Sequence, residues 1–325
     1  MPTLALLATG GTIAGSGPQH HYTAGVLDAT TLLAAVPDLS ALSDWRVEQL
    51  FSLDSRDMQP AHWLQLAERI HALQADPSID GIIVTHGTDT LEETAFALHH
   101  LVKTSKPVVL TAAMRPASAL SADGPLNLLH AACTALDPYA AQHGVVVVAD
   151  SDVIAARHLV KAHTHKPDAL QSIDGCGVLG QILAGRVCWQ AAPQSSGTTF
   201  LLNAAQWLPR VDILSFCAGA PAGLIDLHIA AGARGLVLAL SGHGSIPAEW
   251  RPALSHARDA GIHIIRASRI TAGGVWHGCN EDDDLTGCVA AGLRTPQQAR
   301  VLLMLALASQ PGINREALAL LFATS

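Results

Sequence analysis

The chain has 325 residues, of which 49% are hydrophobic and only 14% are charged, and its formal net charge at pH 7 is -8. This composition predicts a folded chain with a sizeable buried core and excludes a disordered one. The negative charge argues against nucleic acid or an anionic membrane surface as the main partner. No uninterrupted apolar run approaches the roughly 18 residues that are needed to span a bilayer.

The cysteines and the N-terminus indicate a compartment. The six cysteines are dispersed and include no C-x-x-C pair, so we expect small buried thiols in a reducing compartment rather than metal ligands or disulfides. The apolar run at residues 4–8 has no basic region before it, which predicts a strand rather than a signal peptide. We therefore expect a cytoplasmic protein, or a periplasmic one only if a signal peptide was removed before residue 1.

The first strand ends in a glycine-rich loop. Its apolar residues run into Gly10 and Gly11, which are followed by Thr12 and then by Gly15. Glycines allow backbone conformations and close approaches that other residues do not, and loops at the carboxyl ends of parallel strands commonly carry ligand sites. Thr12 is therefore either a catalytic group or part of a tight turn. Residues 16–25 then form a connection long enough to be a lid.

Strand and helix patterns alternate along the next part of the chain. We expect strands at residues 47–53, 81–85, 107–111 and 144–149. Helices are expected to begin near Asp28, at Pro60, at a capping box formed by residues 90–93, and at Pro125. This alternation predicts an α/β fold in which a mostly parallel, doubly wound sheet carries helices on both faces.

The composition changes near residue 191 to Gln, Ser, Thr, Asn and Pro, which is typical of a connection between domains. Further strands are expected at residues 211–216, 235–240 and 262–267, and Thr295-Pro296 starts a final helix. We therefore predict an N-terminal catalytic α/β domain (1–190), a linker (191–210) and a smaller C-terminal α/β domain (211–325).

Polar side chains follow three of the predicted strands: Thr12, Ser55 and the pair Thr88-Asp89. The ends of parallel strands project to one edge of a sheet, so these groups can converge there. A threonine hydroxyl becomes a good nucleophile only when a base takes its proton. Lys161 is a candidate base, because it lies after a strand in a locally uncharged run where desolvation favours a neutral amine.

Each of these residues also has a purely structural interpretation. Lys161 can extend to a solvated surface, and Asp89 can be an ordinary acid at a helix N-terminus. Ser55 can be a turn former, and Tyr22 can be a packing anchor in its loop. A second kind of site is also open, because His163 and His165, with His158 nearby, could bind a metal. However, no H-E-x-x-H motif is present, and 17 histidines make chance pairs common. The phosphate-binding glycine motifs are absent as well.

Taken together, the motifs resemble the bacterial-type L-asparaginases, the threonine amidohydrolases that include the glutaminase-asparaginases. Two segments carry the resemblance most specifically, Ala-Thr-Gly-Gly-Thr-Ile-Ala-Gly at residues 8–15 and His-Gly-Thr-Asp-Thr at residues 86–90. Supporting matches lie at residues 22–25, 55–58, 113–116, 121–125 and 298–303. The resemblance covers nearly the full length of the chain.

The resemblance implies a reaction and a set of catalytic residues. Thr12 would be the nucleophile, with Tyr22 on a loop that closes over the substrate. Thr88, Asp89 and Lys161 would form the second catalytic group, with Lys161 helping to deprotonate a threonine or a water. The reaction would be hydrolysis of L-asparagine to L-aspartate and ammonia through an acyl-threonine intermediate, with no metal or organic cofactor. The alternatives are a dual glutaminase-asparaginase, a metal-dependent amidohydrolase and a non-catalytic amino-acid sensor.

The resemblance also implies substrate-binding positions and an assembly. The positions are Gly11, Ser55, Arg56, Gly87, Thr88, Asp89, Ser245 and Glu281. Ser245 and Glu281 would come from a neighbouring subunit in a homotetramer built from two intimate dimers, although a residue next to Glu281, within residues 280–284, is the alternative. Arg56 replaces the Gln or Glu of many relatives, and Ser245 the Asn of some. Both departures bear on whether asparagine or glutamine is preferred.

Overall fold

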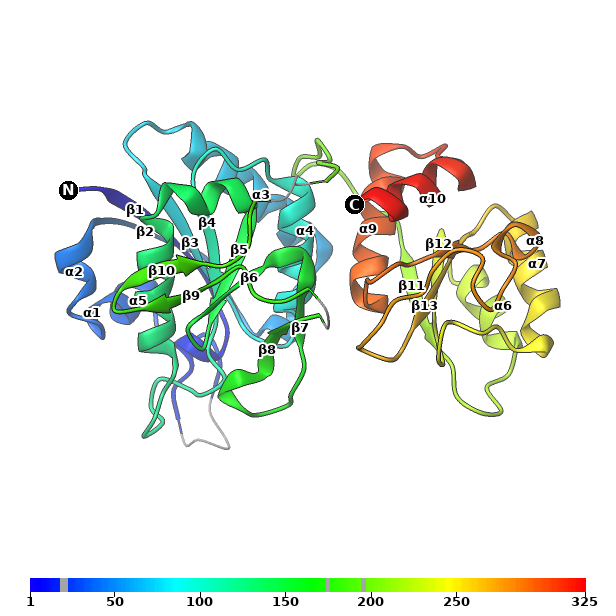
Figure 1. The fold of residues 1–325 in the computed structure, drawn as a ribbon, viewed down its shortest axis with the longest axis horizontal. Coiled ribbons are helices and arrows are strands. Elements are labelled where there is room, and N and C mark those ends of the chain that lie inside the picture. The colour runs from blue at the N-terminus through cyan, green and yellow to red at the C-terminus, as the bar shows by residue number, and fades with distance from the viewer. Residues whose placement is uncertain (18–22, 174–175, 194–196) are drawn as a thin grey trace. The chain divides into compact units, whose positions relative to one another are not determined.

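The computed structural model describes residues 1–17, 23–173, 176–193 and 197–325 (Figure 1). These residues form two compact units. The N-terminal unit contains Met1–Ser172 and Cys176–Thr199, and the C-terminal unit contains Phe200–Ser325. No helix in the described ranges has both the length and the apolar character required to cross a membrane.

The N-terminal unit is built on one eight-stranded sheet with the order β10-β9-β6-β5-β4-β3-β1-β2. Its strands are β1 (Thr3–Gly10), β2 (Asp44–Leu53), β3 (Gly81–Thr85), β4 (Val108–Thr111), β5 (Val145–Ala149), β6 (Asp152–Ala155), β9 (Gly180–Leu183) and β10 (Arg186–Trp189). The strands from β5 to β2 run parallel, whereas β6, β9 and β10 pair in antiparallel fashion at one edge. The predicted α/β fold with a mostly parallel sheet is confirmed.

The central strands form because their residues are suited to burial on both faces. Every residue of β3, β4 and β5 is buried, and these strands consist mainly of Val and Ile, whose branched side chains pack well on a pleated surface. Such continuous apolar strands are typical of parallel sheets covered on both sides. The predicted bounds of β3 are confirmed, whereas β2 begins at Asp44, before the predicted start.

Helices cover both faces of this sheet (Figure 1). One face carries α1 (Ala29–Ala34), α2 (Leu39–Leu42) and α5 (Gly124–Ala135), and the other carries α3 (Pro60–Ala75) and α4 (Leu91–Leu101). The side chain of Asp28 accepts a hydrogen bond from the Thr31 N–H and so caps α1. Pro60 occupies the first turn of α3, as the sequence predicts.

A separate two-stranded ribbon carries Lys161. Its strands β7 (Leu159–Lys161) and β8 (Leu170–Ser172) pair in antiparallel fashion and lie outside the main sheet. Lys161 is therefore the last residue of a strand, and the prediction that it follows one is wrong by a single position. The ribbon follows a 3₁₀ turn, η4 (Ala156–His158), and both contact α4.

The C-terminal unit has a four-stranded parallel sheet with the order β11-β12-β13-β14. Its strands are β11 (Val211–Ser215), β12 (Gly235–Leu240), β13 (His263–Ser268) and β14 (Val289–Ala290), and its helices are α6 (Gly223–Ala230), α7 (Arg251–Asp259), α8 (Asp283–Thr286), α9 (Pro296–Ser309) and α10 (Arg315–Thr324). Helices α6 and α7 share a core with β11 and β12, and α9 packs on the other face of the sheet (Figure 1).

Two predictions about helix ends have different outcomes. Helix α9 begins after Thr295 as predicted, and Thr295 and Gln298 form a reciprocal capping box. However, α9 is not the final helix, because α10 follows it. The predicted capping box at Thr90 is wrong. Helix α4 does begin directly after it, but the Thr90 Oγ1 donates to the Ser55 carbonyl at 2.7 Å instead of capping the helix.

Candidate functional site

The site lies where the order of the strands reverses. The chain passes from β1 to β2 on one side and then crosses to β3 on the other, so β1 lies between β2 and β3. Loops that leave neighbouring strands in opposite directions open a crevice at the carboxyl edge of a sheet. Thr12 follows β1 in this position, and Thr88 follows β3.

Glycines bring these two loops into contact. Gly11 has a φ of 80°, and a Cβ at this position would lie only 2.3 Å from both the Cα and the N of Gly87. Gly10, with a φ of 103°, similarly leaves no room for a Cβ beside the Leu53 carbonyl. Directly after them, Thr12 opens a short 3₁₀ turn, η1 (Thr12–Ala14), and its side chain is largely buried.

A third loop joins these two. Ser55 begins a 3₁₀ turn, η2 (Ser55–Asp57), after β2 and is buried. Its Oγ accepts the Asp89 N–H at 3.2 Å, and its carbonyl accepts the Thr90 hydroxyl at 2.7 Å. A Cβ on Gly87 would lie 2.6 Å from the Ser55 Oγ. The loops that carry Thr12, Ser55 and Thr88 therefore meet, as the sequence predicts.

Lys161 reaches this meeting point from the β7-β8 ribbon. Its Nζ donates to the Thr88 Oγ1 at 2.9 Å and to the Asp89 Oδ1 at 2.5 Å. The Lys161 side chain is 18% exposed and that of Asp89 57%. Lys161 thus binds two neighbouring site residues, which contradicts its interpretation as a lysine that extends to a solvated surface.

A buried polar chain supports the loop that carries Thr88. The fully buried His86 lies with its Nδ1 2.7 Å from the Gly87 carbonyl and its Nε2 3.0 Å from the Thr94 Oγ1. Because a carbonyl only accepts, we assign the proton to Nδ1, which leaves Nε2 to accept from Thr94. The Thr94 hydroxyl in turn accepts the Trp63 Nε1–H at 3.1 Å. Burial lowers the pKa of His86 to about 4, so the ring is neutral at pH 7.

Glu92 lies in the first turn of α4, next to Lys161. Its carboxylate is half-buried and accepts the Lys161 backbone N–H at 3.1 Å. Burial raises the pKa of Glu92 to about 7, against the opposing effects of that hydrogen bond and of the Lys161 charge. The sequence by itself predicts no individual role for His86 or Glu92. For His86 the available signal was a polar residue directly after a continuous apolar strand, whereas Glu92, beside Glu93 in the first turn of a helix, gave no such signal.

The remaining predicted residues of the N-terminal unit differ in their surroundings. The Arg56 guanidinium pairs with Asp54 at 2.9 Å, and the Arg56 side chain is 73% exposed. The Asp54 carboxylate therefore partly neutralises the positive charge of Arg56, which directly follows Ser55 in the sequence. Tyr22 lies outside the residues that the structure describes.

Ser245 and Glu281 both lie in the C-terminal unit. Ser245 is exposed, whereas Glu281 is buried. The Glu281 carboxylate accepts the Ile246 N–H at 2.8 Å and pairs with Arg251 at 2.8 Å. It is Asn280, exposed and with a φ of 63°, whose amide lies 3.4 Å from the Ser245 Oγ. The assignment of Glu281 stays a prediction, and Asn280 is the neighbour that competes with it.

The histidines that could bind a metal are engaged with each other and with the backbone. The rings of His163 and His165 lie 4.5 Å apart between centroids. The His163 Nδ1 accepts the backbone N–H groups of His165 and Lys166 at 3.2 and 3.3 Å. Over the described ranges, no group of three or more His, Cys, Asp or Glu side chains is placed to hold a metal ion.

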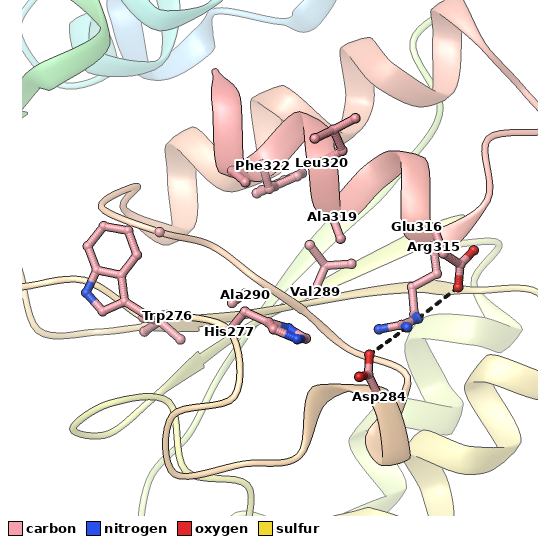
Figure 2. Close-up of a pocket in the computed structure, with 13 residues that line it drawn as sticks. Trp276, His277, Asp284, Val289, Ala290, Arg315, Glu316, Ala319, Leu320 and Phe322 are labelled. Carbon is pink, nitrogen blue, oxygen red and sulfur yellow. Dashed lines mark hydrogen bonds and ion pairs between the residues drawn. The ribbon is translucent and has the colours of Figure 1, made fainter.

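A cavity of about 510 Å³ lies in the C-terminal unit beside β14 and α10 (Figure 2). Val289, Phe322 and other apolar side chains form much of its wall, and Figure 2 shows Arg315 at one end with its two ion-pair partners. Arg315 pairs with Asp284 at 2.7 Å and with Glu316 at 3.5 Å. None of the predicted site residues lines this cavity.

Both units match known protein families. Residues 3–195 match the model of the asparaginase N-terminal domain, and residues 210–322 match the model of the glutaminase/asparaginase C-terminal domain. A crystal structure of a probable cytoplasmic L-asparaginase from Campylobacter jejuni superposes with a TM-score of 0.94 at 37% identity, over 100% of each chain.

Individual relatives match over almost the whole chain. A probable periplasmic L-asparaginase of Haemophilus influenzae is 39% identical, and L-asparaginase 2 of Escherichia coli is 38% identical, each over 94% of this chain and 89% of the relative. A glutaminase-asparaginase of Pseudomonas fluorescens is 36% identical over 94% of this chain and 86% of the relative. The chain belongs to the asparaginase family.

Proposed function

We propose that this chain is an L-asparaginase, which hydrolyses the side-chain amide of L-asparagine to L-aspartate and ammonia through an acyl intermediate on Thr12. Family membership supports the reaction class. One observation supports the mechanism most: the loops that carry Thr12 and Thr88 approach closely at Gly11 and Gly87, and the Lys161 Nζ reaches the Thr88 hydroxyl from the β7-β8 ribbon.

The chemistry follows from these groups. The Thr12 oxygen attacks the amide carbonyl, and backbone N–H groups of the glycine-containing loops stabilise the oxyanion that forms. The departing nitrogen takes the proton that Thr12 gave up, together with the electron pair of the C–N bond, and leaves as ammonia. Water then attacks the acyl-threonine, and its proton returns to the Thr12 oxygen as aspartate is released. The Thr88 hydroxyl and the Lys161 amine relay the proton from threonine or water, and the Asp89 carboxylate orients the amine. Tyr22 assists Thr12 from its loop.

The substrate is a small zwitterion that needs a partner for each charge. Ser55 and the backbone at Gly11 and Gly87 hold its carboxylate, and Asp89 binds its ammonium. Asp89 supports this role because more than half of its side chain is exposed although it contacts Lys161. Arg56 modulates affinity from the rim of the site.

A dual glutaminase-asparaginase is the second candidate. It is favoured by relatives of that name, such as the one from Pseudomonas fluorescens, at identities close to those of the L-asparaginases. Glutamine is longer than asparagine by one methylene, which in a pocket changes binding by only about 1–3 kcal/mol. The reaction itself would be the same.

The proposal extends to assembly and location. Two intimate dimers form a tetramer, in which Ser245 and Glu281 or Asn280 of a neighbouring subunit complete each site. We also propose a cytoplasmic location, which the dispersed spacing of the cysteines supports. The prediction that the cysteines are buried is wrong for most of them, because Cys188, Cys217 and Cys279 are exposed and only Cys288 is buried. The relatives differ on the location, because one is named periplasmic and another cytoplasmic. Cell fractionation would decide it.

Ammonia release from asparagine and from glutamine tests the reaction. It should be measured with and without EDTA for the wild type and for Thr12→Ala and Thr12→Ser. We expect Thr12→Ala to lower kcat by at least about 1,000-fold, Thr12→Ser to retain part of the activity, and EDTA to have no effect.

Each alternative gives a different result in this assay. Full activity of Thr12→Ala would remove Thr12 as the nucleophile. Loss of activity in EDTA would indicate a metal-dependent amidohydrolase. Asparagine binding without ammonia release by the wild type would indicate a sensor. Comparable kcat/KM for both amides would establish the dual specificity.

A further inference from the structure

Lys161 is not held by the main sheet, although the proposed chemistry depends on its position. It ends β7, a three-residue strand whose only ladder within the described residues is with β8. A strand in the main sheet is aligned by hydrogen bonds along its neighbours, but this ribbon has no ladder with β1 or β3, the strands that Thr12 and Thr88 follow. The ribbon contacts α4 through β7 and β6 through β8, so the end of β7 that carries Lys161 is positioned by contacts with α4.

The backbone N–H of Lys161 points toward α4 for a geometric reason. In an antiparallel ladder, pairs that exchange hydrogen bonds alternate with pairs that do not. The Ala162 N–H donates to the Ala169 carbonyl at 2.7 Å, so Lys161 and Leu170 form the pair that does not exchange bonds. The Lys161 N–H is thus directed away from β8, and it needs a partner elsewhere.

Glu92 supplies that partner, and it does so from the segment that Lys161 must reach. Its Oε2 lies 3.1 Å from the Lys161 N, although 69 residues separate the two in the chain. Thr88 and Asp89, which the Lys161 Nζ contacts, lie just before the first turn of α4, which contains Glu92. A carboxylate in the first turn is also favoured by the helix dipole.

We propose that Glu92 is a positioning residue for Lys161, which acts by accepting the Lys161 backbone N–H and so fixes the strand end at the distance from which the Nζ reaches Thr88. This inference rests on the proposed function, because it concerns the proton relay of that reaction. Glu92 contacts neither substrate nor the reacting atoms, and its effect passes through Lys161.

The hydrogen-bond acceptor can be separated from the charge by two variants. Glu92→Leu removes the acceptor, whereas Glu92→Gln keeps an oxygen at the same place without charge. We expect Glu92→Leu to lower kcat by about 10- to 100-fold, as misplacement by about 1 Å does, with KM within about twofold of wild type. Glu92→Gln should stay within about fivefold of the wild-type kcat. Glu68→Gln, on an exposed position of α3, removes the same charge and should match wild type.

A double-mutant cycle distinguishes positioning from general stability. In a Lys161→Met background, Glu92→Leu should cause no further loss of kcat, because its effect depends on the amine. Additive losses, a fall in KM and kcat together, or a glutamine variant as impaired as the leucine variant would each overturn the inference.

If Glu92→Leu does not fold, amide exchange in the wild type decides instead. The Lys161 N–H must exchange far more slowly than that of the exposed Thr164, and equal rates would overturn the inference.

Failure of this inference is distinct from failure of the proposed function. A wild type that releases no ammonia, or a fully active Lys161→Met, would refute the proposed reaction or its relay. A wild-type kcat for a folded Glu92→Leu, with the kcat of Lys161→Met lowered but measurable, would refute only the role of Glu92.

Discussion

At the scale of single residues, the site depends on buried polar side chains that satisfy one another. His86 is fully buried, and its two nitrogens bind the Gly87 carbonyl and the Thr94 hydroxyl. The bond to Gly87 holds the peptide that leads into Thr88. A charged imidazole could not accept the Thr94 proton and would be costly without water. The geometry therefore requires a neutral ring, which agrees with the lowered pKa of His86.

The lowered pKa of His86 predicts a pH dependence of stability. Its pKa falls from 6.5 in the unfolded chain to about 4 in the folded one, so the unfolded state binds more protons between these values. The free energy of unfolding must therefore fall as the pH drops from 6.5 toward 4, by about 2 kcal/mol between pH 7 and pH 5. Urea unfolding at both values should show a loss that is larger by about 2 kcal/mol in wild type than in His86→Gln. The other histidines whose pKa burial lowers, His62, His130, His143 and His263, titrate in both chains and cancel in this difference.

A matched variant isolates the titration. Thr94→Val removes a hydrogen bond but keeps the titrating ring, so it should lower stability at both pH values and retain the wild-type pH dependence. Glu92 has the opposite sign, because its pKa rises to about 7, and it is present in all three chains. Equal losses in wild type and His86→Gln would contradict the prediction.

At the scale of elements, the site is made by loops that follow strands. Two threonines that precede helices, Thr90 and Thr295, show that such a loop can take a hydroxyl away from its usual role as a helix cap. Thr295 caps α9, whereas Thr90 turns its hydroxyl to the Ser55 carbonyl and ties α4 to the loop after β2. The local sequence predicts a capping box at both threonines, because each is followed three residues later by Glu or Gln. Only the neighbouring strand end at Ser55 decides which bond forms.

The contact between the β1 and β3 loops predicts the effect of a single methyl group. In Gly11→Ala, the Cβ would lie 2.3 Å from Gly87, so the two loops must separate. We expect a loss of at least about 2 kcal/mol in stability and of about 100-fold in kcat/KM. Gly185→Ala is the control, because Gly185 also has a positive φ but a Cβ added there would meet no atom within 4 Å. It should cost only about 1 kcal/mol and leave kcat/KM unchanged, and a similar effect of both variants would contradict the prediction.

At the scale of the whole molecule, the predicted site residues are divided between two units. Thr12, Ser55, Thr88, Asp89 and Lys161 lie in the N-terminal unit, and Ser245 and Glu281 lie in the C-terminal unit. The proposed tetramer brings the second set from a neighbouring chain. If each site is shared between two chains, two different inactive variants can restore activity when they assemble together. Both substitutions then fall in one site, and a second site is left with neither.

Mixed assemblies test this arrangement. Thr12→Ala damages the N-terminal contribution, and Ser245→Arg damages the C-terminal one. In a dimer with one chain of each kind, shared sites would leave one site with both lesions and one with none. Refolding equal amounts together should then restore about a quarter of the wild-type activity, since about half of randomly formed dimers are mixed. No recovery, with light scattering confirming mixed oligomers, would contradict shared sites.

Much of the N-terminal fold follows from local pattern. Continuous Val and Ile runs predict the buried strands, and Pro60 and Asp28 mark helix starts, because these signals act within one turn or one strand. The antiparallel strands β6, β9 and β10 and the β7-β8 ribbon were not predicted. They are only three or four residues long, so each offers too few positions to show a hydrophobic period.

The catalytic chemistry is likewise determined partly by the sequence and partly by the tertiary structure. The residue types of Thr12, Thr88 and Lys161, and the resemblance to a family, can be read from the chain, since nucleophile, hydroxyl and amine are properties of side chains. The tertiary structure alone decides that Gly11 touches Gly87, that Lys161 reaches Thr88, and that Glu92 accepts the backbone of Lys161. These contacts join residues about 70 or more positions apart, so they depend on the order of strands in the sheet and on the packing of the ribbon, which no local pattern contains.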